Sequence, residues 1–534
     1  MKGFFTIKRL ILLVLTIFAI AKISLSLVES WSQPQIQSRL ELYQTNLLLH
    51  AAEWQPDKNT DATADNATPN LTGARNALIG NEPFSAAQKQ YEEALHTAET
   101  TQKNLAEKIA DINKPPQLSV GDNAAVVKAQ QQQLQLSSAQ VKRLIDELDL
   151  RLGLLQVQQQ KTAQALKTWT KLANQSEQIT NQNIPDESLA ETAQVLVGLW
   201  SQPPRLLPDA EPKIQKNLDS WFRYRALAKL YELQQRQDVL SSLQTTEQEI
   251  AQQAIFKLAI IGGIPGFGGI IGVTLLLFLI AQRLLQGTRS ILATNGDLPW
   301  ETPWDWEIIW QVLIVGFFFI GQFLLPVFFG LLQLDPSGFT VKMKALYVLI
   351  SYLLMAGGGL LVLYLSIKPF LPIPEEWFHF KFFSNWIFWG FGGYFVALPL
   401  VILVSLINQQ IWQGQGGSNP ILPLALEGRD NGALLIFFIT ASVAAPIFEE
   451  IMFRGFLLPS LTRYLPVWGA ILASSLLFAI AHLSLSEVLP LATLGMVLGI
   501  VYTRSRNLLS SILLHSLWNA GTLFSLFVLG SGSN

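Results

Sequence analysis

The sequence contains no cysteine and few charged residues. The absence of cysteine excludes disulfides, thiolate catalysis, iron–sulfur clusters and cysteine-based zinc sites. Only 14% of the 534 residues are charged and the formal net charge is -2, which argues against a nucleic-acid-binding protein, because such proteins need a concentrated basic face. The H-E-x-x-H, G-x-G-D and G-x-S-x-G signatures are also absent, which removes the usual motifs of zinc, aspartyl and serine proteases. Without the last motif, no serine is marked as a nucleophile.

Apolar residues are abundant, and they are concentrated in two regions. Hydrophobic residues make up 50% of the chain, and the mean hydropathy is +0.31. This distribution predicts an all-α, polytopic membrane protein with a soluble helical insert. We expect four parts, namely an N-terminal membrane anchor at residues 1–30, an extracytoplasmic helical domain at 31–254, a membrane helix with a cytoplasmic linker at 255–300, and a membrane domain at 301–534.

The N-terminus has the pattern of a signal anchor. Lys2, Lys8 and Arg9 precede an apolar run at residues 10–28, whose length suits one membrane crossing with its positive flank in the cytoplasm. A cleaved signal peptide is the alternative, because the most apolar part ends near Ala21. The anchor is favoured, since no A-x-A cleavage site follows.

The polar, Gln-rich region that follows is predicted to be helical. We expect helices at residues 86–113, 126–160, 162–178, 187–200 and 213–254. Gly153 with Trp169, and Tyr224 with Tyr231, partly match the spacing of a tetratricopeptide helix pair. A generic helical hairpin domain explains these residues equally well. Either form would offer a binding surface for a protein partner.

The chain is hydrophobic from Ile255 onward. Membrane segments are expected at residues 255–281, 305–334, 343–367, 383–411, 432–459, 468–484, 488–503 and 508–530. With the anchor, this gives nine crossings. Nine crossings assign most basic residues of the connecting loops to the cytoplasm, as the positive-inside tendency requires; these are Arg283, Arg289, Lys368, Arg463, Arg504 and Arg506. Lys342 and Lys344 are the exceptions.

The segment 441–461 carries three ionisable residues inside an apolar run: Glu449, Glu450 and Arg454. An ionised side chain at the centre of a membrane helix costs about 2.5 to 3.5 kcal/mol, so this cluster needs a compensating function. On a helix, Glu450 and Arg454 share one face and can pair, whereas Glu449 points about 100° away and stays available. A buried structural brace is the alternative explanation of the pair.

Two further polar clusters lie on later apolar segments. Phe478 and His482 are four residues apart, as are His515 and Asn519, so each pair shares one helical face. A carboxylate with an imidazole can deprotonate a water, and nitrogen donors can stabilise an oxyanion, which is the chemistry of hydrolysis. Glu449, His482 and His515 are also credible ligands for a divalent metal such as zinc, and the sequence does not choose between the two mechanisms.

The ordered trio EE-x-x-x-R, F-x-x-x-H and H-x-x-x-N resembles the signature of the CPBP family of intramembrane proteases, which includes the CAAX prenyl endopeptidases and the Abi-type bacteriocin-processing or immunity proteins. The resemblance covers about residues 430 to 530. It implies that Glu449 activates water with His482, and that His515 and Asn519 form the oxyanion side or complete a metal site. Glu450 and Arg454 would support the first motif.

We therefore expect an endopeptidase that cleaves a peptide, prenylated or not, in the cytoplasmic half of a bacterial plasma membrane or a thylakoid-type membrane. A non-catalytic scaffold or immunity-type protein, which would bind a partner through residues 31–254, is the alternative. A transporter ranks third, because no inverted repeat is visible.

Overall fold

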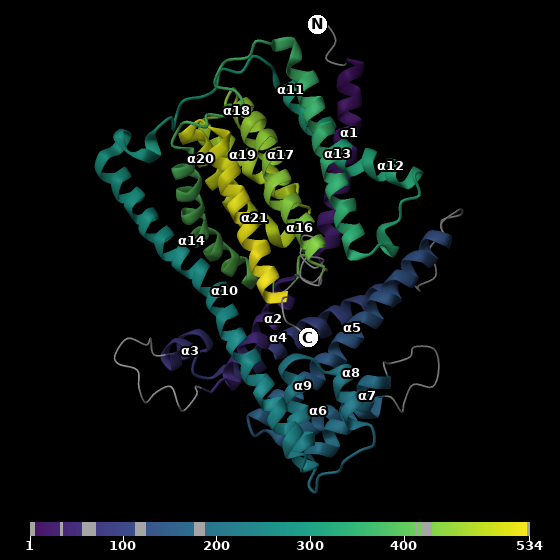
Figure 1. The fold of residues 1–534 in the computed structure, drawn as a ribbon. Coiled ribbons are helices and arrows are strands. Elements are labelled where there is room, and N and C mark those ends of the chain that lie inside the picture. Colours follow the sequence, from purple (N-terminus) through teal and green to yellow (C-terminus); the bar gives the residue numbers. More distant parts are fainter. Residues whose placement is uncertain are drawn as a thin grey trace. The chain divides into compact units, whose positions relative to one another are not determined.

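A computed structural model describes residues 6–31, 36–55, 71–112, 124–175, 187–412, 415–418 and 430–530. In these ranges the chain is helical and contains no β-strand, as predicted. It divides into two compact units (Figure 1). We call them the membrane unit, which consists of Met1–Ile36 and Ile264–Ser531, and the helical unit, Gln37–Gly263.

The helical unit consists of α2 (Ile36–Glu53), α3 (Leu71–Ile79), α4 (Pro83–Ile112), α5 (Ala124–Gln158), α6 (Thr162–Gln175), α7 (Glu187–Trp200), α8 (Ala210–Asn217), α9 (Ser220–Leu233) and the start of α10 (Gln237–Gln286). Helices α5 and α6 pack so closely that a side chain at Gly153 would clash with the buried ring of Trp169. The Trp169 indole donates to the carbonyl of Leu150 at 3.1 Å. This contact explains the small-residue and aromatic spacing without a tetratricopeptide repeat, which stays a prediction.

The single helix predicted at 213–254 is wrong, because the chain turns twice within that range. Leu218 adopts an extended conformation after α8, and Ser220 has a φ of 52°. Gln235 has a φ of 57° between α9 and α10. Left-handed backbone is rare for residues other than glycine, so sequence pattern alone gave no sign of these turns.

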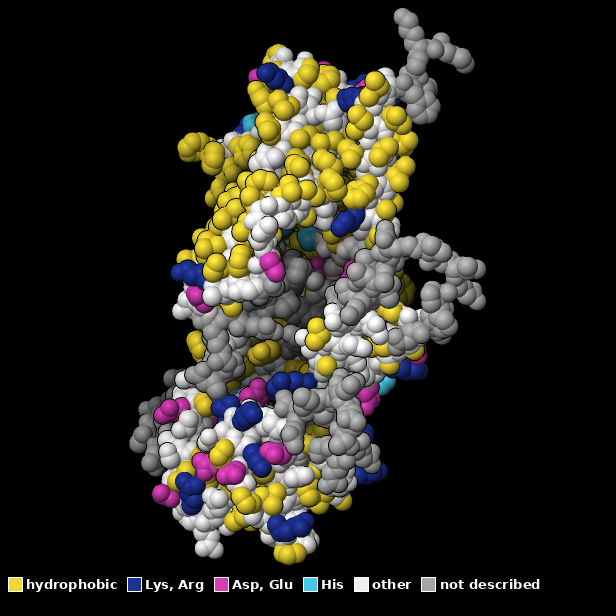
Figure 2. Space-filling model, turned by 90° about the vertical axis from the view of Figure 1, so that its right-hand side faces the viewer, with side chains coloured by type: hydrophobic (Ala, Val, Ile, Leu, Met, Phe, Trp, Pro, Cys, Tyr) yellow, Lys and Arg dark blue, Asp and Glu magenta, His cyan; other side chains and the backbone are white. Residues whose placement is uncertain are grey.

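The membrane unit consists of α1 (Ile7–Trp31), the end of α10, η1 (Gly287–Arg289), η2 (Ile291–Ala293), α11 (Trp306–Gln311), η3 (Val312–Leu324), α12 (Leu325–Leu331), η4 (Pro336–Gly338), α13 (Val341–Ile367), η5 (Lys368–Phe370), α14 (Trp386–Trp412), α16 (Asn431–Ile439), η6 (Thr440–Ala444), α17 (Ala445–Glu450), η7 (Ile451–Leu457), α18 (Leu458–Leu461), α19 (Val467–Ile480), η8 (Leu485–Glu487), α20 (Val488–Ser505) and α21 (Leu508–Gly530). Hydrophobic side chains cover most of its visible face (Figure 2). Such a surface suits a lipid environment.

Among the described residues, eight helices are long and apolar enough to cross a membrane. The ninth predicted segment, 468–484, forms α19, which has only 14 residues. Its length of about 21 Å is less than the roughly 30 Å hydrocarbon core of a bilayer. The loop after α19 is nevertheless bonded to the far end of α1, where the Leu485 amide donates to Ser30 Oγ at 3.3 Å. The chain thus still passes from one end of the unit to the other here.

Three π-helical segments interrupt the membrane helices, and each ends two residues before a proline. The segments η3, η6 and η7 precede Pro326, Pro446 and Pro459. Proline lacks an N–H, and its ring clashes with the carbonyl four residues earlier, so a wider turn with i→i+5 bonding relieves the crowding. Pro265 and Pro399 lie inside α-helical segments, so proline alone does not dictate a π turn.

Helix α1 is packed along the membrane unit over its whole length. Arg9 pairs with Glu307 at 2.7 Å, and the Trp310 indole donates to Thr16 Oγ1 at 2.7 Å. The aromatic contacts of the later turns are Phe18 with Phe323 and Trp31 with Trp412. In the structure, α1 is therefore an integral helix of the unit rather than a separate tether.

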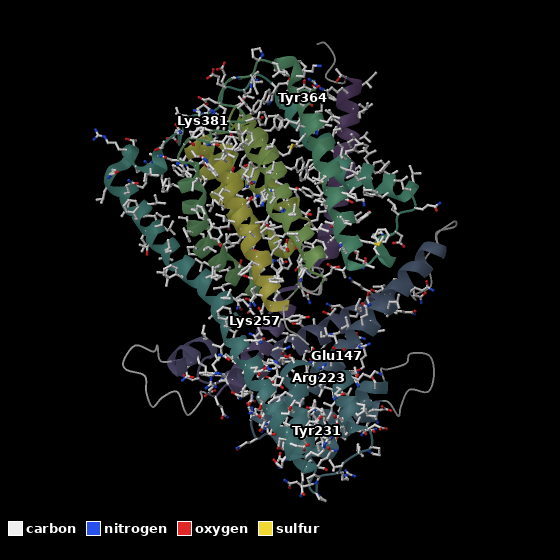
Figure 3. All side chains as sticks on the ribbon, in the orientation of Figure 1. Glu147, Arg223, Tyr231, Lys257, Tyr364 and Lys381 are labelled. Carbon is white, nitrogen blue, oxygen red and sulfur yellow. The ribbon has the colours of Figure 1, made fainter. Side chains whose placement is uncertain are left out.

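Basic side chains gather at one end of the membrane unit, around the connecting segment 298–307. Arg9 reaches Glu307, Arg463 donates to the carbonyl of Thr302 at 3.0 Å, and Arg506 donates to the carbonyl of Leu298. Figure 3 labels Lys381 at this same end. This end of the unit thus carries Arg463 and Arg506, two of the cations that sequence analysis assigned to the cytoplasm.

Candidate active site

The three sequence motifs meet inside the membrane unit. The first lies on α17 and η7, the second on α19 and the turn that follows it, and the third on α21. These elements lie side by side with α20 in the core of the unit (Figure 1). The π-helical segments η6 and η7 flank α17 on both sides, and such turns are frequent at functional sites.

Glu450 and Arg454 form a salt bridge of 2.8 Å, and both side chains are fully buried. Arg454 also donates to the carbonyl of Gly495 at 3.2 Å. Gly495 is close to Ser475, so a small residue is needed where α20 approaches. A buried charge needs a paired partner, and here each member of the pair supplies the other's counter-charge.

His515 lies between the two carboxylates. Its Nδ1 is 2.9 Å from Glu450 Oε1, and its Nε2 is 3.9 Å from Glu449 Oε2. Because Glu450 accepts, Nδ1 carries the proton of the neutral ring and Nε2 is left as an acceptor. The Glu449 contact is too long for a direct hydrogen bond, and its length suits a bridging water.

Tyr352, from α13, completes the surroundings of Glu449. Its hydroxyl donates to Glu449 Oε1 at 3.0 Å. Glu449 is 15% exposed, whereas Glu450 is fully buried. Glu449 is therefore the carboxylate that remains accessible. Sequence reasoning missed Tyr352, since it lies almost a hundred residues from the first motif and has no motif of its own.

Phe478 is the ring that the other two motifs share. The Arg454 guanidinium lies 4.5 Å from its centroid, and the rings of His482 and His515 lie at 4.9 and 5.6 Å. His482 Nδ1 is 2.9 Å from the carbonyl of Phe478, so this nitrogen donates and Nε2 is free of that bond. The structure thus brings Glu449 beside His515, and no ion pair of Glu449 with His482 occurs among the described residues.

Asn519 lies one turn beyond His515 and contacts a different element. Its Nδ2 donates to the carbonyl of Ala441 at 2.7 Å. Ala441 lies in η6, where π-helical bonding leaves carbonyl groups available to side chains. One N–H of Asn519 therefore holds η6 in place, and the second N–H remains for another acceptor.

The three residues suggested as zinc ligands do not form a ligand set as placed. Among the residues that the structure describes, no three His, Asp or Glu side chains are grouped closely enough to hold a metal ion. Glu449 and His515 alone approach each other, at 3.9 Å. Zinc ligands lie about 2.0 to 2.2 Å from the ion and need a third protein donor, so the set Glu449, His482 and His515 does not fit without movement.

Comparisons with known proteins match the part of the chain that carries the three motifs. Residues 431–521 match the family model described as Type II CAAX prenyl endopeptidase Rce1-like. The chain is 25% identical to the membrane-embedded CAAX protease MroQ of Staphylococcus aureus over 216 residues, which are 39% of this chain and 85% of that protein. It is 28% identical to the putative membrane peptidase YdiL of Bacillus subtilis over 133 residues, 25% of this chain and 53% of that protein. No solved structure matches at comparable significance.

The family match contains Glu449, Glu450, Arg454, His482 and His515 together with Asn519, and it leaves the helical unit outside. Both relatives are distant in sequence, and both are named as membrane peptidases or proteases. The resemblance found in the three motifs is confirmed: residues 431–521 form an Rce1-like CAAX prenyl endopeptidase domain of the CPBP family.

Proposed function

We propose that this chain is an intramembrane endopeptidase that hydrolyses a peptide bond with a water held by Glu449 and His515. The observation that carries the proposal is the separation of 3.9 Å between Glu449 Oε2 and His515 Nε2. A water between two acceptors can donate one proton to each of them. This pairing replaces His482 with His515 as the partner of Glu449 in holding the water.

The hydrolysis would proceed without a covalent intermediate. Glu449 takes a proton from the water as the water oxygen attacks the scissile carbonyl. Glu449 then gives this proton to the leaving amine. Glu450 holds His515 in the tautomer whose Nε2 accepts, and Arg454 keeps Glu450 charged. The remaining N–H of Asn519 is the donor that would stabilise the oxyanion.

A cavity of about 360 Å³ between α1 and η3 is the proposed entry for the substrate. Leu483, the residue after His482, forms part of its wall. Lys22 and Glu29 also line it. A charged side chain within a membrane helix is costly unless it faces water or a counter-charge. The apolar part of the wall includes Phe18, Phe318 and Phe319.

We further propose that the basic end of the membrane unit faces the cytoplasm, in a bacterial plasma membrane or a thylakoid-type membrane. Lys and Arg are enriched on the cytoplasmic side of membrane proteins. His515 lies seven residues into α21 from this end, or about 10 Å, which puts the site in the cytoplasmic half. The helical unit, residues 31–254 in the sequence prediction, would then be extracytoplasmic.

The substrate can be found by comparing the membrane proteomes of cells that express the wild type or Glu449→Gln. A substrate should accumulate uncut in the variant, and its new terminus should appear only with the wild type. His379→Gln, which changes a histidine outside the three motifs, is the matched control. Adding and removing zinc in the purified protein tests metal assistance separately.

A non-catalytic scaffold remains the second candidate, because the helical unit lies outside the family match. Such a protein would bind a protein partner through this unit and would not need the motif residues. Full complementation of a deletion strain by a variant with Glu449, His482 and His515 all replaced by alanine would favour the scaffold. Loss of complementation with normal protein levels would favour the protease.

A further inference from the structure

In the helical unit, a serine, a histidine and a glutamate are linked in series by two hydrogen bonds. His50 Nε2 lies 2.8 Å from Ser220 Oγ, and His50 Nδ1 lies 2.6 Å from Glu247 Oε1. His50 and Glu247 are 6% and 2% exposed. The three residues come from α2, α9 and α10, so tertiary packing alone brings them together.

The two hydrogen bonds fix which atoms donate and which accept. A carboxylate can only accept, so His50 Nδ1 carries the proton that Glu247 receives. His50 Nε2 is then an acceptor in the neutral ring, and the Ser220 hydroxyl donates to it. This order of contacts, hydroxyl to imidazole to carboxylate, is how a base activates a serine nucleophile and a third group orients the base.

The backbone at Ser220 has the strain and the donors that such a site uses. Ser220 has a φ of 52° and is the first residue of α9. The first N–H of this helix that bonds to a carbonyl is that of Arg223, which is labelled in Figure 3, and Asp219 provides no side-chain cap. In the described contacts, the amides of Trp221 and Phe222 have no acceptor. Unpaired amides at a helix start can bind an oxyanion.

A structural brace would also link α2, α9 and α10, but it does not account for Ser220. A hydroxyl satisfies the second nitrogen of the buried His50, but a brace does not require left-handed backbone at the residue that supplies this hydroxyl. Left-handed backbone costs a serine of order 1–3 kcal/mol, and such strain concentrates at active sites. Ser220 is half-buried, so a small substrate can reach it. The surrounding sequence, LDSWF, lacks the G-x-S-x-G pattern and gave no signal.

We propose that the helical unit carries a second hydrolytic site, in which Ser220 is the nucleophile, His50 the general base and Glu247 the positioning residue. Ser220 Oγ bonds to the carbonyl carbon of an ester as its proton passes to His50 Nε2. The ester C–O bond breaks, and the leaving alcohol takes that proton. Water then cleaves the acyl-serine in the same way, giving a carboxylic acid and restoring the Ser220 hydroxyl.

The surroundings favour a neutral ester with a small acyl group. Burial, together with the negative charges of Glu53 and Glu247, raises the pKa of Tyr224 to about 12. Glu53 also accepts from the Trp221 indole at 2.9 Å, next to the nucleophile. Two carboxylates this close would repel an anionic substrate. Trp221 and Phe222 are fully buried and restrict the room for a long acyl chain.

To test the proposal, the purified full-length protein in detergent is labelled with an alkyl fluorophosphonate, which reacts with activated serines. The labelled residue is then identified by mass spectrometry. Hydrolysis of p-nitrophenyl acetate is measured in parallel. We expect an adduct on Ser220 in the wild type, none in Ser220→Ala, and labelling about 100-fold slower in His50→Gln. Glu247→Gln should slow labelling, and Glu247→Asp should restore part of it, as a positioning role requires.

Two controls separate this site from other serines and from the membrane site. Ser241→Ala changes an exposed serine whose hydroxyl donates to the Asp238 carbonyl, and it should leave labelling unchanged. Glu449→Gln should also leave it unchanged. A folded wild type without an adduct on Ser220 would overturn the proposal. So would an adduct that forms equally fast in His50→Gln, a comparison that holds even where Ser220→Ala does not fold.

Discussion

Arg454 and Glu450 are fully buried, and each is the other's main counter-charge. Removing one partner of a buried pair typically costs about 3 to 5 kcal/mol, because the other charge is left unpaired. We expect Arg454→Met to lower the stability of the membrane unit by this amount. Thermal unfolding in detergent measures the loss, with the exposed Arg143→Met as the control.

A double variant separates charge from packing at this position. Glu450→Leu combined with Arg454→Met removes both charges and should recover most of the lost stability, since apolar replacements of a buried pair are often neutral. It should not recover activity, because His515 loses the acceptor that fixes its tautomer. An Arg454→Met protein that unfolds at the wild-type temperature would contradict the assigned role of the pair.

Asp149, in α5, makes the helical unit sensitive to pH. Burial, reinforced by the nearby Asp146 and Glu99, raises its pKa from 3.8 to about 6, although Lys171 opposes the shift. A raised pKa means that its stabilising contribution is full below pH 3.8 and is lost as the pH rises through 6. Asp149→Asn should therefore stabilise the unit at pH 7, by about 1 kcal/mol after allowance for solvent screening.

Hydrogen exchange of the α5 amides measures this effect at residue resolution. The ratio of protection between Asp149→Asn and the wild type should be largest at pH 7 and should approach one near pH 4. A constant ratio across this range would mean that Asp149 does not titrate in the folded unit. Arg143→Gln, which alters a nearby ion pair with Glu147 on the same helix, is a matched control.

The spacing of residues within one helix was enough to predict half of the site. Glu450 and Arg454 are four apart, and they pair as that spacing requires. Contacts between helices could not be predicted in this way. Tyr352 reaches Glu449 only because α13 packs against α17, and His515 is the histidine beside Glu449 because α21 also packs against α17.

At the scale of elements, Pro446 lies in the turn in front of Glu449 and Glu450. It follows the end of η6 by two residues, and an alanine there would restore an N–H that can bond four residues back. We expect Pro446→Ala to straighten η6 towards α-helical bonding, and to move Glu449 relative to His515. A misplacement of about 1 Å can cost roughly 100-fold in rate.

The measurement for Pro446→Ala is the rate of peptide cleavage together with the unfolding temperature. The rate should fall while the temperature stays level or rises, because the helix gains a hydrogen bond. Pro399→Ala, in an α-helical part of α14, is the matched control and should retain the rate. A Pro446→Ala enzyme with the full wild-type rate would argue against any role of the π turn.

Helix lengths followed from the apolar runs, because a bilayer requires about 20 apolar residues for each span. The positions of the turns could not be predicted from the apolar runs. The helix break at Ser220 depends on left-handed backbone at a residue other than glycine, which the sequence pattern does not indicate. Helix α19 is short because the chain turns at Leu483, which has a φ of 58°. The three π turns carried a signal in Pro326, Pro446 and Pro459, but Pro265 shows that this signal is not sufficient.

At the scale of the whole molecule, the absence of cysteine makes orientation easy to test. Ser241→Cys introduces one thiol in the helical unit, and Glu375→Cys introduces one at the basic end of the membrane unit. Both positions are exposed. A membrane-impermeant maleimide added to intact cells should label Ser241→Cys and spare Glu375→Cys, which should react only after lysis. The reverse pattern would place the basic end outside the cytoplasm.

In the proposed mechanism, Glu449 activates the water that cleaves the peptide. The most direct measurement is the cleavage rate of one peptide, with and without a farnesyl group, by the purified wild type, Glu449→Gln and His379→Gln. We predict that Glu449→Gln loses at least about 100-fold in rate while it unfolds at the wild-type temperature, and that His379→Gln keeps the wild-type rate. Cleavage by Glu449→Gln at the rate of the wild type would contradict the account.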